Sequence, residues 1–288
     1  MEQLEGQPNF FQNNLASTEE WEIGIDEAGR GPVLGPMVYG SCFWPVKIKK
    51  ELAKLGFADS KALKEQERDD LFDKIKEVNE KYLGFAVTVL DPEYISNRML
   101  QKEKFSLNKI SHETAIKLIE SALNRGINVT HCYLDTVGPT EYYRDLLKNH
   151  FKNSHPHVKF TVAEKAESKY PVVAAASICA KVTRDAALKE WKFREKIPGG
   201  GTFEFGSGYP GDEKTVNWLK AHRDPVFGFP DLVRFSWKTC ETMINEKITV
   251  NYGEEVVANS ASTLTNFVAM EKRGHFLGKL GMTNHFVL

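Results

Sequence analysis

The segment Ile23–Pro32 most constrains how this chain can fold, because an apolar run there ends abruptly at charged residues. Residues 21–25 form the run, Asp26 and Glu27 end it, and the next turn places an arginine between two glycines. Carboxylates hold hard divalent cations, a glycine loop exposes backbone N–H groups to a ligand, and arginine pairs with phosphate. The segment therefore predicts chemistry on a phosphodiester, carried out where a strand ends.

The composition is that of an ordinary globular protein. The chain has 288 residues, of which 41% are apolar and 27% charged, so length allows one large domain or two smaller ones. No stretch approaches eighteen apolar residues, so we expect no membrane partner. The four cysteines form no CxxC pair, which favours a reducing compartment. Because the formal net charge is −1, binding to nucleic acid would need a local basic patch, and residues 181–196 are one candidate.

Apolar and β-branched runs predict five strands, and helical spacing predicts helices between and after them. The alternation of strands and helices favours an α/β fold. Because three strands come in succession before the alternation begins, we expect one mixed sheet of five strands flanked by helices. The expected strands are 21–25, 37–44, 82–90, 129–135 and 158–162, and the expected helices are 65–81, 111–126, 142–151, a long one from 170, 212–222 and 236–247.

A run of three glycines after Pro198 breaks the chain. We therefore divide the sequence into a polar N-terminal segment (1–20), a core (21–200), a small C-terminal helical extension (201–250), and a tail (251–288).

Two aspartates follow expected strands. Asp26 ends the first strand and Asp135 ends the fourth, and ligand sites of open α/β sheets lie beyond strand C-terminal ends where strand order reverses. If the two strands are neighbours, the two carboxylates face each other. Glu27 joins them only if the strand twists or bulges, since consecutive side chains on a strand point to opposite faces. A simple capping role for each aspartate stays open.

A dinucleotide-binding loop is the competing interpretation of the glycines. Gly29, Gly31 and Gly35 miss the GxGxxG spacing by one residue, and Pro36 leads into an apolar run rather than a helix. This interpretation fails.

Five motifs in order resemble type 2 ribonuclease H, and the eukaryotic catalytic subunit in particular. The resemblance covers roughly residues 21–245 and includes the segment VFGFPDLVRFSWKT (226–239). The motifs are GIDEAGRGPVLGPMVYG from residue 23, ADSK (58–61), YLDTVG (133–138), KAESKYPVVAAASICAKVTRD (165–185) and GSGYP (206–210).

The resemblance implies a ribonuclease-H-like mixed five-stranded sheet, with residues 21–200 as the catalytic core and residues 201–250 as a substrate-binding extension. It also implies that the protein is an endoribonuclease. Such an enzyme hydrolyses the RNA strand of RNA–DNA hybrids and cuts 5′ of a single ribonucleotide in duplex DNA, leaving 3′-hydroxyl and 5′-phosphate ends. Its roles are ribonucleotide removal from DNA and RNA primer removal. Two divalent ions, Mg or Mn, would be held by four carboxylates and would serve a two-metal mechanism. The implied catalytic and metal-binding residues are Asp26, Glu27, Asp135 and Glu167.

Glu167 departs from the family, which has Asp in the corresponding KAD motif. The extra methylene moves the carboxylate by about 1–1.5 Å, a shift that can cost on the order of 10²-fold in rate. Either the local backbone has adjusted, or metal preference or rate has changed. We expect that Glu167 still binds metal.

The resemblance also implies how RNA is told from DNA. Gly29, Arg30 and Gly31 would contact the 2′-hydroxyl, and Tyr209 in GSGYP would lie against the neighbouring nucleotide and sense the RNA-to-DNA junction.

Phosphate contacts are implied for three basic residues. Lys61 and Arg184 match family positions, and Lys181 precedes Arg184 by one helical turn. Such contacts position the duplex without reading its sequence, so cleavage should depend on salt. Asn108 and His112 lie in a matching stretch without an assigned role.

Similarity to the eukaryotic form implies a heterotrimer with two accessory subunits, mainly in the nucleus with some cytoplasmic protein. Residues 251–288 would be the docking element, although Phe267, Phe276, Leu277 and Leu280 could equally form a small core of their own. Two alternatives remain at this stage: another nuclease of the same fold, and a non-catalytic hybrid-binding subunit.

Overall fold

A computed structural model describes residues 9–10, 19–57, 63–79, 82–103, 105–195, 204–224 and 226–245. Its centre is a mixed sheet with strand order β1-β4-β3-β2-β5-β6. The α/β class and all five expected strands are confirmed. The strand β1 adds a two-residue edge to these five, and it is too short to show a sequence pattern.

The direction of the strands changes at β2. Strands β1, β4, β3 and β2 pair antiparallel in turn, whereas β2, β5 and β6 pair parallel. The strand β2 therefore lies where the strand order turns back, the position at which α/β sheets form ligand sites. The strands are β1 (Asn9–Phe10), β2 (Trp21–Ala28), β3 (Met37–Pro45), β4 (Gly84–Leu90), β5 (Val129–Asp135) and β6 (Lys159–Ala163).

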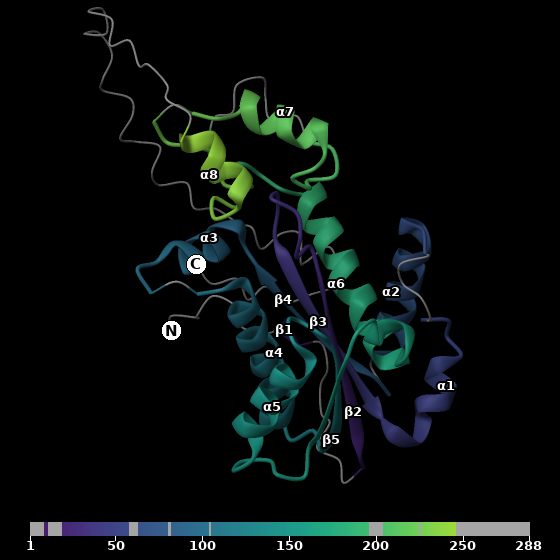
Figure 1. Ribbon diagram of the computed structural model, residues 1–288. Coiled ribbons are helices and arrows are strands. Elements are labelled where there is room, and N and C mark those ends of the chain that lie inside the picture. Colours follow the sequence, from purple (N-terminus) through teal and green to yellow (C-terminus); the bar gives the residue numbers. More distant parts are fainter. Residues whose placement is uncertain are drawn as a thin grey trace, which may run out of the picture.

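Helices cover both faces of the sheet (Figure 1). One face packs on α4 and α5 through Ile23, Ile25 and Leu134, and the other packs on α6 and α2 through Val38 and Cys42. The helices are α1 (Lys49–Ala53), α2 (Glu65–Asn79), α3 (Pro92–Leu100), α4 (Leu107–Asn124), α5 (Thr140–Phe151), α6 (Pro171–Lys189), α7 (Glu213–Ala221) and α8 (Lys238–Asn245), with short 3₁₀ turns η1 (Val46–Ile48) and η2 (Ala166–Ser168).

The helix α6 lies unusually close to the sheet. A Cβ atom at Gly24 would collide with the backbone of Val172, and one at Gly40 would collide with the carbonyl of Ala176. Only glycine at these two positions lets the helix backbone rest directly on β2 and β3. This contact brings the side chain of Ser177 to the end of β2.

The expected start of the second long helix was wrong. The sequence favoured Ser111 as its cap, but Ser106 is the N-cap, and its hydroxyl accepts a hydrogen bond from the N–H of Lys109 at 3.2 Å. Ser111 lies one turn inside α4 and has another partner, described below. The helix ends where expected, at Gly126, whose φ is +81°.

The helices α7 and α8 gather at one end of the molecule, beside the end of α6 (Figure 1). They share a third apolar cluster with the core, in which Trp218 and Leu232 pack with Val33, Leu34 and Trp191. The extension is therefore continuous with the loop that follows the two glycines. No helix in the described ranges is long and apolar enough to span a bilayer.

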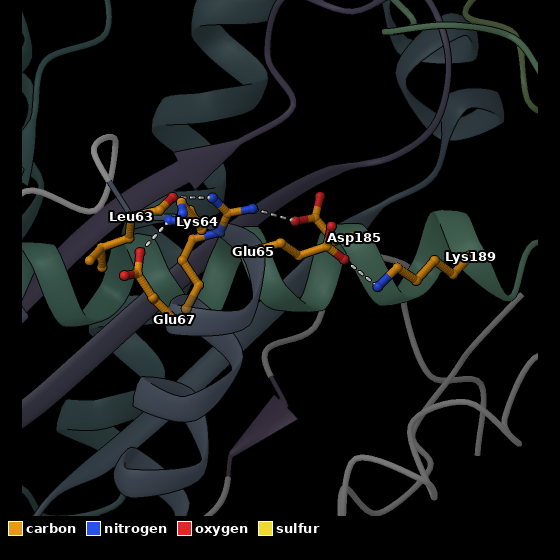
Figure 2. A network of polar contacts seen from close by, with 7 residues as sticks. Leu63, Lys64, Glu65, Glu67, Asp185 and Lys189 are labelled. Atoms are coloured by element: carbon orange, nitrogen blue, oxygen red, sulfur yellow. Dashed lines mark hydrogen bonds and ion pairs between the residues drawn. The ribbon is translucent and has the colours of Figure 1, made fainter.

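Polar contacts fasten α2 to the same end of α6 (Figure 2). Arg68 pairs with Asp185 at 3.1 Å and also donates to the carbonyl of Leu63 at 2.9 Å. Glu65 pairs with Lys189. The start of α2 is thus held next to the turn of α6 that carries Arg184.

Candidate active site

Asp26 and Asp135 are neighbours at the ends of two parallel strands. Ile25 of β2 pairs with Leu134 of β5, and each aspartate is the next residue along its strand. Asp26 is only 7% exposed. Burial raises its pKa, the hydroxyl of Ser177 opposes that rise, and the charges of Asp135 and Glu167 add to it. The condition set by the sequence, that these strands be adjacent, is confirmed.

A backbone hydrogen bond links Asp135 to the turn that carries Glu167. The N–H of Ala166 donates to Oδ1 of Asp135 at 2.8 Å. Lys165, just before the turn, has a left-handed backbone (φ 53°, ψ 45°). Glu167 is 2% exposed. The turn η2 thus carries a buried carboxylate within electrostatic reach of Asp26.

Glu27 lies on the opposite face of β2. The ladder between β2 and β3 is regular through Glu27–Tyr39 and Ala28–Val38, without a bulge, so its side chain points toward α4 rather than α6. Burial and the charge of Asp26 raise its pKa, Arg30 lowers it, and the charge of Asp135 raises it. The sequence analysis expected Glu27 to join the aspartates only through a twist or a bulge, and the ladder has no bulge there. Glu27 is nevertheless close enough to Asp26 and Asp135 for their charges to raise its pKa.

The four carboxylates suit a hard divalent ion. No three His, Cys, Asp or Glu side chains of the described residues form a ready-made metal cage. Mg²⁺ does not need one, because it binds one or two carboxylates and retains water and phosphate ligands. Burial is the main cause of the raised pKa values of Asp26 and Glu27, and the charges of neighbouring carboxylates add to it. A bound cation would compensate those charges.

Arg234 holds the glycine loop from beneath, and sequence reasoning missed it. It is fully buried, and its guanidinium donates to the carbonyls of Gly29 (2.6 Å), Arg30 (3.2 Å) and Gly35 (2.8 Å). Trp237 donates to the carbonyl of Gly31 at 3.1 Å. The available signal was an arginine inside the apolar stretch LVRFSW, where a charge has to find partners.

The side chain of Arg30 turns toward α4. It donates to Ser111 Oγ at 2.7 Å and to Oδ1 of Asn108. Asn108 also packs against Gly138, where an added Cβ would lie 2.8 Å from its Nδ2. These contacts give Asn108 and Ser111 a place in the site. His112 bonds to the carbonyl of Val137 at 2.9 Å and supports the same segment.

Tyr209 packs on the glycine loop. An added Cβ on Gly31 would lie 2.8 Å from Cε1 of the tyrosine ring. The ring remains 51% exposed. Two segments far apart in the sequence therefore meet at the loop that follows Asp26 and Glu27, and Tyr209 is open to solvent.

The basic residues differ in how the structure places them. Arg184 is largely buried beneath the loop, where it donates to the carbonyls of Pro36 (3.2 Å) and Leu34 (3.4 Å), and burial lowers its pKa. Lys181 is half-buried one turn earlier on α6. Lys61 lies outside the described residues, as do residues 251–288. Phosphate contact by these residues stays a prediction.

An α/β fold of this topology, with carboxylates at the end of its central strand, defines a ribonuclease-H-like nuclease. The family model for ribonuclease HII matches residues 23–240. The chain belongs to the ribonuclease HII family. Its relatives include one subunit of ribonuclease H2 from Homo sapiens, 50% identical over 78% of this chain and 73% of the relative. The corresponding protein of Arabidopsis thaliana is 50% identical over 81% of this chain and 78% of the relative.

Solved structures agree. Ribonuclease H2 from Pyrococcus horikoshii superposes with a TM-score of 0.63 at 31% identity, covering 78% of this chain and 97% of the other. A ribonuclease HIII in complex with Mn²⁺ has a TM-score of 0.53 at 20% identity, covering 80% and 71%, and supports the fold alone. The chain is thus a ribonuclease H that cuts RNA in RNA–DNA hybrids, similar to the eukaryotic catalytic subunit. Neither alternative, another nuclease of the same fold or a non-catalytic hybrid-binding protein, is favoured.

Proposed function

We propose that this chain, besides cutting long hybrids, incises duplex DNA on the 5′ side of a single embedded ribonucleotide and leaves 3′-hydroxyl and 5′-phosphate ends. The observation that carries the proposal is the contact of Tyr209 with Gly31, in the loop that directly follows Asp26 and Glu27. A loop for the sugar and an aromatic ring for its neighbour are the two parts that an enzyme specific for one ribonucleotide needs.

Asp26, Glu27, Asp135 and Glu167 would hold two divalent ions, Mg or Mn. When bound, such ions activate the attacking water and stabilise the leaving oxygen. The chain's own contribution is the placement of its carboxylates. Ala166 fixes one oxygen of Asp135, and Ser177 restrains Asp26.

The sugar would be recognised by the backbone of Gly29, Arg30 and Gly31. Their three carbonyls accept hydrogen bonds from Arg234 and Trp237, so the loop is fixed before substrate arrives, and its remaining backbone groups can meet a 2′-hydroxyl. The side chain of Arg30 is engaged with Ser111, so Arg30 acts through its main chain.

Phosphate groups would be contacted by Lys61, Lys181 and Arg184. Arg184 already donates from Nε and one Nη to loop carbonyls. Only its remaining N–H groups would therefore be available to a phosphate of the substrate strand. These contacts would position the duplex without reading sequence.

We also propose that the chain works with two accessory subunits, mainly in the nucleus, in removing ribonucleotides from DNA and RNA primers. Relatives 50% identical to it are named as one subunit of ribonuclease H2, which supports an assembly of several chains. Residues 251–288 follow the extension and are the proposed docking element.

A direct test uses purified chain, alone and with its partners, on duplex DNA carrying one ribonucleotide, with and without magnesium. We expect magnesium-dependent incision 5′ of the ribonucleotide. A long hybrid and an all-DNA duplex serve as positive and negative substrates. Cleavage of the hybrid without any cleavage at the single ribonucleotide, in the presence of partners, would contradict the proposal.

A further inference from the structure

The buried hydroxyl of Thr215 joins helix α7 to the turn that carries Tyr209. Its Oγ1 accepts a hydrogen bond from the N–H of Gly208 at 3.0 Å and donates to the carbonyl of Phe205 at 2.7 Å. A hydroxyl has one proton, so the bond to Phe205 excludes donation to Oδ2 of Asp212, 3.4 Å away. One fully buried side chain thus holds both arms of the turn.

Asp212 holds the tip of the same turn. Its Oδ1 caps α7 by accepting from the N–H of Lys214 at 3.0 Å. Its Oδ2 accepts from the N–H (2.6 Å) and the hydroxyl (2.7 Å) of Ser207. The hydrogen bonds from Ser207 lower the pKa of Asp212 to about 2, so the carboxylate is ionised at neutral pH. The start of helix α7 therefore holds the turn by hydrogen bonds at two places. Thr215 bonds to the base of the turn, and Asp212 bonds to its tip.

The peptide group of Gly208 passes this restraint on to the glycine loop. Its N–H is held by Thr215, and its carbonyl accepts from the N–H of Val33 at 2.8 Å. Val33 lies two residues after Gly31, on which the ring of Tyr209 packs. The phenol oxygen of Tyr209 makes no hydrogen bond to the described residues, so the backbone of the turn sets where the ring lies.

We propose that Thr215 is a positioning residue that sets, through Tyr209, how strongly the enzyme prefers a single ribonucleotide over a long hybrid. The inference deepens the proposed function and rests on it. A long hybrid presents a 2′-hydroxyl on every nucleotide of one strand, so any of its nucleotides can occupy the site. Correct placement of a long hybrid therefore does not depend on the ring of Tyr209. An isolated ribonucleotide presents one hydroxyl beside a deoxyribose, and a displaced ring loses that contact.

The test compares Thr215→Val, which keeps the shape but removes the hydroxyl, with Thr215→Ser, which keeps the hydroxyl. Both are assayed in the complete complex on duplex DNA with one ribonucleotide and on a uniform hybrid. We expect Thr215→Val to lower the ratio of the two kcat/KM values by roughly tenfold, as for a displaced contact, and Thr215→Ser to restore it. Thr242→Val is the control, since Thr242 is exposed and its hydroxyl bonds only to the carbonyl of Lys238 within α8.

A double-mutant cycle with Tyr209→Ala separates positioning from a general effect on folding. If Thr215 acts through the ring, Thr215→Val changes the ratio no further once the ring is gone. If Thr215→Val does not fold, Ser207→Ala carries the test, because it loosens the same turn from its exposed side and should lower the same ratio.

Equal losses on both substrates, or additive losses in the cycle, would overturn the inference. A wild-type complex that does not cleave at the single ribonucleotide would instead overturn the proposed function. If Tyr209→Ala changes the ratio but neither Thr215→Val nor Ser207→Ala does, the proposed function stands and this inference fails.

Discussion

Arg234 donates from Nη2 to the carbonyl of Gly29 at 2.6 Å, across 205 positions of sequence. Two more loop carbonyls accept from the same guanidinium. The C-terminal extension therefore supports the glycine loop directly. If that loop binds the ribose as proposed, a defect in the extension should lower the rate of cleavage.

Arg234→Gln should be both less stable and less active. It leaves loop carbonyls buried without donors, each worth about 1–3 kcal/mol, so we expect the free energy of unfolding to fall by roughly 3 kcal/mol and kcat/KM by at least about tenfold. Urea unfolding and hybrid cleavage measure the two effects. The matched control is Arg144→Gln, whose ion pairs with the exposed carboxylates of Glu141 and Asp145 should contribute under about 0.5 kcal/mol. Equal effects of both substitutions would contradict the account.

Glu167→Ala should abolish magnesium-dependent cleavage, because it removes one of the buried carboxylates that raise the pKa of Asp26. Glu167→Asp restores the residue typical of the family and should keep activity while changing the ratio of activity in Mn²⁺ to activity in Mg²⁺. The measurement is activity over a titration of each ion. An active Glu167→Ala enzyme with unchanged magnesium dependence would exclude a metal-binding role.

The stability of the metal-free protein should fall as pH rises through the neutral range. Asp26 and Glu27 have raised pKa values in the folded state. The unfolded chain therefore releases their protons first, above pH about 4, and between that pH and the folded pKa values the folded state binds more protons, so stability decreases with pH. Asp26→Asn should flatten this decrease and raise the melting temperature at pH 8. Glu120→Gln, an exposed carboxylate, should not.

Magnesium should oppose the loss of folding stability at higher pH. Ions that bind only the folded state stabilise it by about 2.7 kcal/mol at one hundred times the dissociation constant, so the gain in melting temperature at pH 8 should disappear in Asp135→Asn. A gain of the same size in that variant would place the ion elsewhere.

Tyr209→Phe should lose cleavage at a single ribonucleotide more than cleavage of a long hybrid. The phenol oxygen makes no hydrogen bond to the described residues, and the ring is half exposed, so the substitution removes a substrate contact without disturbing the loop. Parallel kcat and KM values for the two substrates measure this. Tyr142→Phe is the control, because Tyr142 is 60% exposed on α5. Equal losses on both substrates would count against a junction role.

The sequence predicted the strands and the aspartates that end two of them, because these depend on local patterns: apolar runs and the residues that end them. That β2 and β5 are neighbours was only a condition, which the sheet topology meets. It could not decide whether the strand bulges at Glu27, because a bulge depends on pairing with the neighbouring strand, here the pairing of Glu27 with Tyr39. Arg234 and Thr215 were missed for a related reason. Each bonds to a backbone group that only folding brings close. Every residue has a backbone carbonyl, so the type of the partner residue does not reveal such a hydrogen bond in the sequence.

The functional part of the site followed from resemblance rather than from pattern. Tyr209 before Pro210 would pass as an ordinary turn residue, and only its packing on Gly31 gives it a physical reason to be there. Arg184, by contrast, matched a phosphate-binding position of the family. The structure shows that it also donates hydrogen bonds to the carbonyls of Leu34 and Pro36.

The central claim is that carboxylates and the Gly29–Gly31 loop act together on one ribose. The most direct measurement compares two duplexes that differ only in a single 2′-hydroxyl, incubated with the complete complex and magnesium, with the cut site mapped to the nucleotide. The account predicts one cut, 5′ of the ribonucleotide, no cut in the deoxy duplex, and no cut by Asp135→Asn. Equal cutting of both duplexes, or a cut that persists in Asp135→Asn, would contradict it.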